Sequence, residues 1–104
     1  DEKLDAQITA SIADWGTTRK KMFGGTCHLI NGNMLCGVYQ NFLILRLGEK
    51  AAGEALKRPG VKPFDITGKP MKGWVMIDAN TLDQPSFLKW LKHCREFVAT
   101  LPPK

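Results

Sequence analysis

The stretch RKKMFGGTCHLINGNMLCGVYQNFLILRLG, residues 19–48, decides the fold, because apolar runs fill it and glycine or polar turns divide it. Asn31-Gly32 predicts a type I′ hairpin, since both central residues of that turn need positive φ. Gln40-Asn41 predicts a second turn, and Gly24-Gly25 forms either an earlier turn or a bulge. The pairs that follow are Leu29 with Met34, Cys27 with Cys36, Val38 with Leu43, Cys36 with Leu45 and, if the first turn forms, Met22 with Cys27.

Side chains alternate between the two faces of a strand, so this register assigns each residue to a face. One face is wholly apolar and is expected to carry the helices: Met22, Cys27, Leu29, Met34, Cys36, Val38, Leu43, Leu45 and Leu47. The other mixes aromatic, aliphatic and basic groups: Lys21, Phe23, His28, Ile30, Leu35, Gly37, Tyr39, Phe42, Ile44 and Arg46.

Helical patterns flank this meander on both sides. Apolar residues recur three or four apart over residues 1–15, good helix formers fill 49–58, and an apolar stripe runs through 84–100 behind a capping Asp83. A final strand is expected over residues 73–78, reached through a loop at 61–72. The sequence therefore predicts an α+β fold, with an antiparallel sheet meander and N-terminal, middle and C-terminal helices packed on one face.

The chain has 104 residues, 43% hydrophobic and 24% charged, which predicts one globular domain over residues 1–104. No apolar run approaches the ~20 residues of a membrane helix, and the acidic N-terminus DEKLDAQ is unlike a signal peptide. We therefore expect a cytoplasmic protein with no membrane partner. Because the chain begins at Asp1 without a methionine, a short leader could precede it.

Residues for catalysis are scarce. No GxSxG elbow occurs, Gly24-Gly25 lacks the following Gly-Lys-Ser/Thr of a phosphate loop, and the acids fall mostly outside the strands. Cys27-His28 and His93-Cys94 resemble metal ligands, but neighbours on a strand or helix diverge and do not close on one ion. The sequence therefore predicts no catalytic residues, no metal site, no cofactor and no enzyme.

The predicted pairing of Cys27 with Cys36 allows one redox hypothesis. Opposite residues at a non-hydrogen-bonded site have Cα atoms ~4.5 Å apart, which is within disulfide range. The alternative is that both are small apolar residues kept reduced in the core.

Positive charge is concentrated after the first helix. Residues 1–18 hold one lysine against four acids, whereas the rest holds fourteen Lys and Arg against six acids, for a net charge of +5. These residues form either a solubilising shell or a surface for nucleic acid. The candidate basic patch is Arg19, Lys20, Lys21, Lys57, Arg58, Lys62, Lys69 and Lys72.

The mixed sheet face is the candidate interaction face, because exposed aromatic and apolar groups commonly mark an interface. In composition it resembles the sheets on which RNA-binding domains stack bases. The alternatives are that the chain's own loop covers it, or that a second copy does so in a homodimer. The candidate residues are Phe23, His28, Tyr39, Phe42 and Arg46.

Several motifs together resemble the TfoX N-terminal domain family, also called TfoX/Sxy. They are RKKMFGG at 19–25, NGNM at 31–34, LILRLG at 43–48, PFDITGKPMKGW at 63–74 and LPPK at 101–104. The resemblance implies an α+β domain with helices on an antiparallel sheet. Two-domain members regulate natural competence together with a transcription activator of the cyclic-AMP receptor type. We expect a member of the stand-alone branch, without their helix-hairpin-rich second domain, so their competence role is not carried over directly. The motif glycines and Met22-Phe23 are expected to be structural.

The leading functional hypothesis is a non-enzymatic regulatory module that binds a protein partner, for which a transcription regulator is one class. The first alternative is direct nucleic-acid binding through the basic patch. The second is a small-molecule pocket between a helix and the sheet.

Overall fold

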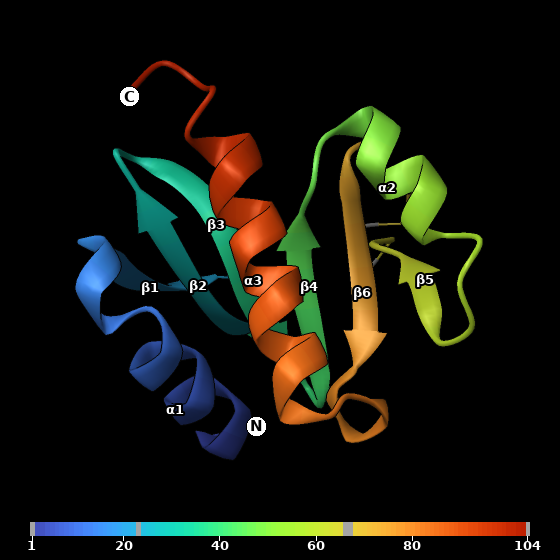
Figure 1. Ribbon diagram of the computed structural model, residues 1–104, viewed down its shortest axis with the longest axis horizontal. Coiled ribbons are helices and arrows are strands. Elements are labelled where there is room, and N and C mark those ends of the chain that lie inside the picture. Colours follow the sequence, from blue (N-terminus) through green and yellow to red (C-terminus); the bar gives the residue numbers. More distant parts are fainter. Residues whose placement is uncertain (1, 23, 66–67, 104) are drawn as a thin grey trace.

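The computed structural model describes residues 2–22, 24–65 and 68–103, and it confirms the α+β class (Figure 1). Within these residues a six-stranded antiparallel sheet carries three α-helices. The helices are α1 (Glu2–Ser11), α2 (Glu49–Ala55) and α3 (Gln84–Val98), with short 3₁₀ turns at Ala13–Trp15 and Ala79–Thr81. The strands are β1 (Thr18–Met22), β2 (Gly25–Ile30), β3 (Asn33–Tyr39), β4 (Phe42–Arg46), β5 (Val61–Pro63) and β6 (Trp74–Asp78).

The strands lie in the order β1-β2-β3-β4-β6-β5, so the first four form the expected meander. Asn31 and Gly32 have φ of 53° and 80°, as a type I′ turn requires. Gln40 likewise has a φ of 55°. Strand β5 was not expected: it forms within the predicted loop and pairs with β6 at the far edge.

The predicted pairing of β2 with β3 is wrong over part of its length. Leu29 does face Met34, but the register then shifts, so that His28 faces Cys36 and Cys27 faces Gly37. Leu35 is the extra residue, and such a bulge reverses the face of every residue on one side of it. Cys27, Leu29 and Met34, which were predicted on the helix-covered face, therefore lie on the opposite face. His28, Ile30 and Leu35, which were predicted on the opposite face, lie on the helix-covered face.

The pairing of β1 also differs from the prediction. Met22 faces Gly25, and Lys20, rather than Met22, faces Cys27. The pairing of these strands is therefore centred one residue earlier in the chain than a turn at Gly24-Gly25 would place it, and Gly25 belongs to β2.

All three helices pack on one face of the sheet, and α3 lies between α1 and α2 (Figure 1). Asp83 caps α3 by accepting a hydrogen bond from the Ser86 backbone N–H at 2.8 Å, as the sequence predicts. The buried residues of this main core are, from the helices and their ends, Leu4, Ile8, Ile12, Ala52, Ala55, Phe87, Leu91, Cys94 and Val98, and, from the sheet and its ends, Leu35, Cys36, Val38, Leu43, Leu45, Leu47, Val75 and Ile77.

The opposite face carries a smaller core, which we call the second-face cluster. Phe64, from the segment after β5, is 1% exposed and packs with Ile44 and Met76. Around these three lie the half-buried Met34, Tyr39, Phe42, Met71 and Trp74. The chain's own segment thus covers part of the face that the sequence left open to a partner. No helix in the described ranges has both the length and the apolar character needed to cross a membrane.

Candidate functional site

The predicted interaction face does not come together as one open surface. His28 lies on the helix-covered side, where it is 2% exposed, so its place on the mixed face was wrong. Phe23 lies outside the described residues. Tyr39 and Phe42 are half-buried at the rim of the second-face cluster.

Arg46 is likewise held within the fold. Its guanidinium carbon lies 5.3 Å from the centre of the Trp74 ring and 5.9 Å from that of Phe97. Such stacking of a cation on aromatic faces fixes the side chain. Arg46 therefore connects the end of β4 to α3 through Phe97.

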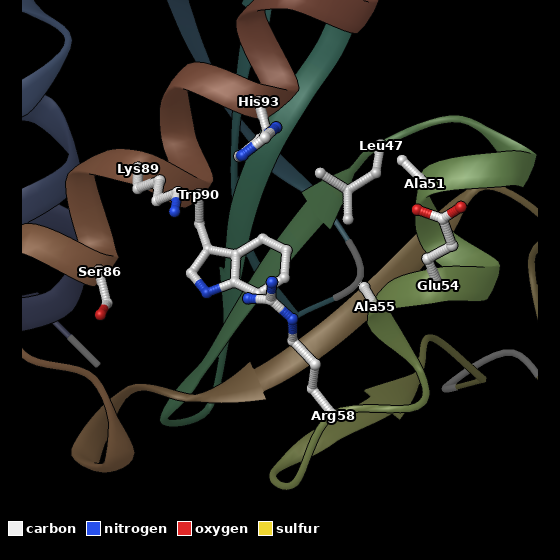
Figure 2. Close-up of a pocket in the computed structure, with 9 residues that line it drawn as sticks. All are labelled: Leu47, Ala51, Glu54, Ala55, Arg58, Ser86, Lys89, Trp90 and His93. Carbon is white, nitrogen blue, oxygen red and sulfur yellow. The ribbon is translucent and has the colours of Figure 1, made fainter.

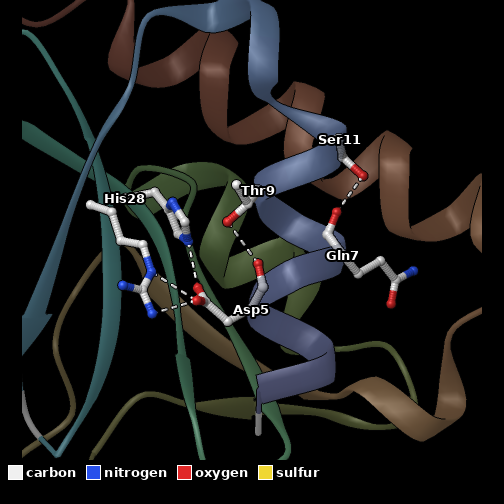
Figure 3. Close-up of polar contacts among 6 residues, drawn as sticks. Asp5, Gln7, Thr9, Ser11 and His28 are labelled. Atoms are coloured by element: carbon white, nitrogen blue, oxygen red, sulfur yellow. Dashed lines mark hydrogen bonds and ion pairs between the residues drawn. The ribbon is translucent and has the colours of Figure 1, made fainter.

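His28 instead forms part of a polar junction with α1. The Asp5 carboxylate contacts His28 Nε2 at 2.8 Å and the Arg19 guanidinium at 2.7 Å (Figure 3). Burial by itself raises the pKa of Asp5, but the hydrogen bonds from Arg19 and His28 outweigh it and hold that pKa below the ordinary 3.8. The junction fastens α1 to β1 and β2.

The basic residues lie in two regions separated by the width of the sheet. Three exposed cations, Arg19, Lys20 and Lys21, follow one another on the edge strand β1. The others belong to the opposite side, around α2, β5 and the segment that follows: Lys57, Arg58, Lys62, Lys69 and Lys72. Two of these stack on aromatic rings, Lys62 on Phe42 and Arg58 on Trp90, each at 5.3 Å.

The redox hypothesis for Cys27 and Cys36 is wrong, because the register places them on opposite faces and both thiols are free. Burial raises the pKa of Cys27 to about 11 and that of Cys36 well above its usual value. Burial also raises the pKa of Cys94. All three thiols are buried and protonated at neutral pH, so none is poised as a nucleophile.

A groove between α2 and α3 combines an apolar floor with charged and aromatic groups, as a binding site does. It has a volume of about 230 Å³, and Leu47 lies at its floor. Figure 2 shows the indole of Trp90 and the guanidinium of Arg58 side by side within it. We call it the α2–α3 groove; its lining is Leu47, Ala51, Glu54, Ala55, Arg58, Ser86, Lys89, Trp90 and His93.

The groove continues along α2 toward the end of α3. A shallower hollow shares Leu47, Ala51 and Glu54 with it and ends at Phe97. Together the two offer an apolar strip beside a polar end at Trp90. Among the described residues, no three His, Cys, Asp or Glu side chains gather as a metal site would require.

Sequence reasoning placed Arg58 in the basic patch but missed the groove. Trp90 lies next to Leu91 of the buried stripe, so its indole falls at the edge of the stripe and is half-buried. A tryptophan in that position of an amphipathic helix was the available signal. The distance between α2 and α3, which opens the groove, is a property of the tertiary structure alone.

Comparison with known proteins gives one match, and it covers nearly the whole chain. Residues 11–98 match the family model described as the TfoX N-terminal domain. No curated protein and no solved structure matches the chain. Because the family model matches most of its length, the chain belongs to the TfoX N-terminal domain family.

Proposed function

We propose that this domain is a non-enzymatic interaction module of a regulatory system, and that it docks a protein partner in the α2–α3 groove. The family resemblance supports the regulatory role and makes a transcription regulator a candidate partner class. The buried, protonated thiols argue against a cysteine nucleophile and agree with a cytoplasmic compartment.

The observation that carries the proposal is the Trp90–Arg58 stack at the mouth of the groove. Tryptophan and arginine are the residue types most enriched where single side chains dominate binding between proteins. The rim around them is polar, whereas the floor is apolar, which is the arrangement of a protein interface.

The open, elongated shape of the groove favours a protein segment over an enclosed small molecule. Sites for drug-sized ligands bury most of the ligand surface, whereas the part beside Trp90, of about 230 Å³, continues into the shallower hollow of about 410 Å³ along α2. One or two side chains of a partner fill such a space, with the shallower strip along α2 taking their neighbours.

Filling the groove from its rim tests the proposal without touching the core. Ala51 is exposed on α2 and lines both parts of the groove, so Ala51→Trp should block docking. Ala10→Trp makes the same change at an exposed helical alanine on α1 and serves as the control. Tagged full-length chains are used to capture partners, which are identified by mass spectrometry.

We expect one partner to be recovered by the wild type and by Ala10→Trp, and to be lost with Ala51→Trp. Equal recovery by all three chains would show that the groove is not the docking site. Circular dichroism and a thermal melt of each variant separate blocked docking from a failure to fold.

Direct nucleic-acid binding is a second candidate, supported by the three consecutive exposed cations of β1. A titration against labelled duplex and single-stranded nucleic acid at two salt concentrations tests it. Affinity that falls steeply with salt, and falls further in Lys20→Gln/Lys21→Gln, would favour this candidate. Absence of binding at low salt would remove it. The mass of the protein in solution, measured alongside, shows whether the chain dimerises.

A further inference from the structure

The position of Arg58 at the α2–α3 groove is unusual for its place in the sequence. Glu54 and Arg58 are four residues apart, a spacing that favours an ion pair on a helix. However, α2 ends at Ala55, and Arg58 follows in a turn whose N–H donates to the Ala55 carbonyl. The guanidinium lies over Trp90 instead, and Figure 2 shows Glu54 on the far side of the groove.

Three side chains bring hydrogen-bond donors to this end of the groove: Arg58, Lys89 and Trp90. Within the described part of the chain, no carboxylate or carbonyl accepts a hydrogen bond from the side chains of Arg58, Lys89 or Trp90. Guanidinium, ammonium and indole N–H groups donate only. The matching ligand is therefore an anion with several acceptor lone pairs.

The stack on Trp90 prepares Arg58 for such a ligand. A guanidinium that lies over an aromatic ring keeps the N–H groups at its edge available, and their planar fork matches a carboxylate. Because the ring holds the side chain near one position, less conformational entropy is lost on binding. Lys89 adds a second positive charge one residue before Trp90, so two cations stand against the single carboxylate of Glu54 in the lining, and the charge at the Trp90 end favours an acidic ligand.

We infer that the Trp90 end of the groove is a carboxylate-binding subsite, and that its occupant is a Glu or Asp side chain in an acidic segment of a partner protein. The inference rests on the proposed function, because it names the partner segment for the same groove. Charge complementarity identifies the segment as acidic, and the apolar strip toward Phe97 adds an apolar residue beside the acid.

The test uses the full chain labelled with ¹⁵N and a capped peptide, Glu-Leu-Glu-Glu-Leu-Glu. The three tryptophans give three indole N–H signals in an NMR spectrum, and a Trp90→Phe sample assigns the one that matters. We expect the peptide to shift the Trp90 signal in a saturable way and to leave those of Trp15 and Trp74 unchanged. The glutamine version of the peptide should bind much more weakly.

Arg58→Gln should weaken peptide binding by about fivefold, the upper range for an ion pair at an exposed site. Arg95→Gln is the matched control, because Arg95 also stacks on a tryptophan, lying 4.9 Å from the centre of the Trp15 ring. It removes the same charge and the same type of contact on the other side of α3, and it should bind the peptide as the wild type does.

Three results would overturn the subsite. If the glutamine peptide binds equally well, the groove docks apolar surface without reading charge. If inorganic phosphate shifts the Trp90 signal as strongly as the peptide, the site takes small anions rather than a peptide. If no signal moves, no carboxylate subsite exists. In each case the capture experiment with Ala51→Trp still decides whether the groove docks a partner, so the two failures are distinguishable.

Discussion

At the scale of single residues, Asp5 contributes more to stability than its position on a surface helix suggests. Its carboxylate is 13% exposed and contacts both the buried His28 and the exposed Arg19. Removing one partner from such a group leaves the other partly desolvated and unpaired. The residue therefore stabilises the attachment of α1 by more than an ordinary surface ion pair would.

We expect Asp5→Asn to lower the free energy of unfolding by about 1–3 kcal/mol at pH 7. The pKa of Asp5 is depressed, so its contribution is present above the unfolded-state pKa and is lost as pH falls through the folded-state pKa. Urea unfolding of both proteins at pH 7 and pH 3 measures this. The difference in the free energy of unfolding between the wild type and Asp5→Asn should be smaller at pH 3 than at pH 7. An equal difference at both pH values would contradict the assigned role of Asp5.

Gly37 is required because the strands approach closely. A Cβ there would lie 2.6 Å from the Thr26 carbonyl oxygen, which is backbone and cannot move aside easily. Gly37→Ala should cost about 2–3 kcal/mol of stability. Gly53→Ala is the control, since a Cβ on that exposed position of α2 meets nothing, and it should stabilise by about 0.5–1 kcal/mol. Equal effects in denaturant titrations would refute the steric explanation.

At the scale of the elements, local signals sufficed for most of the fold. The Asn31-Gly32 turn, the Asp83 cap and the apolar stripe of α3 depend on neighbouring residues only, and each was predicted from the sequence. The bulge at Leu35 was not predictable, because it depends on which neighbours each strand meets in three dimensions. The bulge at Leu35 places His28 on the helix-covered face and Cys27 on the opposite face. The wrong assignment of His28 to the interaction face and the wrong pairing of Cys27 with Cys36 both follow from missing this bulge.

The covering of both faces of the sheet has a measurable chemical result. Cys36 and Cys94 lie in the main core, and Cys27 lies on the other face, where it is 1% exposed. We expect Ellman's reagent to react very slowly with the native protein and to find three thiols after unfolding in urea. Rapid reaction of one thiol in the native protein would show that its covering element opens.

At the scale of the whole molecule, the C-terminal residues are bonded to the chain just after the Asn31-Gly32 turn between β2 and β3. Asn33, which is 3% exposed at the start of β3, donates a hydrogen bond from Nδ2 to the Pro102 carbonyl at 2.9 Å. The contact joins positions 69 residues apart in the chain. This hydrogen bond therefore holds the segment that follows α3 against the start of β3.

Truncation after Leu101 should lower the free energy of unfolding by about 1–2 kcal/mol, because the buried Asn33 amide loses its acceptor. In an Asn33→Leu background the same truncation should cost less, and thermal unfolding of the four proteins forms a double-mutant cycle. Equal costs in both backgrounds would show that the tail acts through other contacts.

The position of α3 in the chain also bears on how the protein is made. Strands β1 to β4 are neighbours in sequence and in space, so they pair by closing short loops and can form early during synthesis. The helix that covers β3 and β4 is translated after all six strands. Until it emerges from the ribosome, the apolar side chains of β3 and β4 lack the cover that α3 gives them in the folded domain, so we expect the unfinished chain to associate with other chains more readily than the finished domain does.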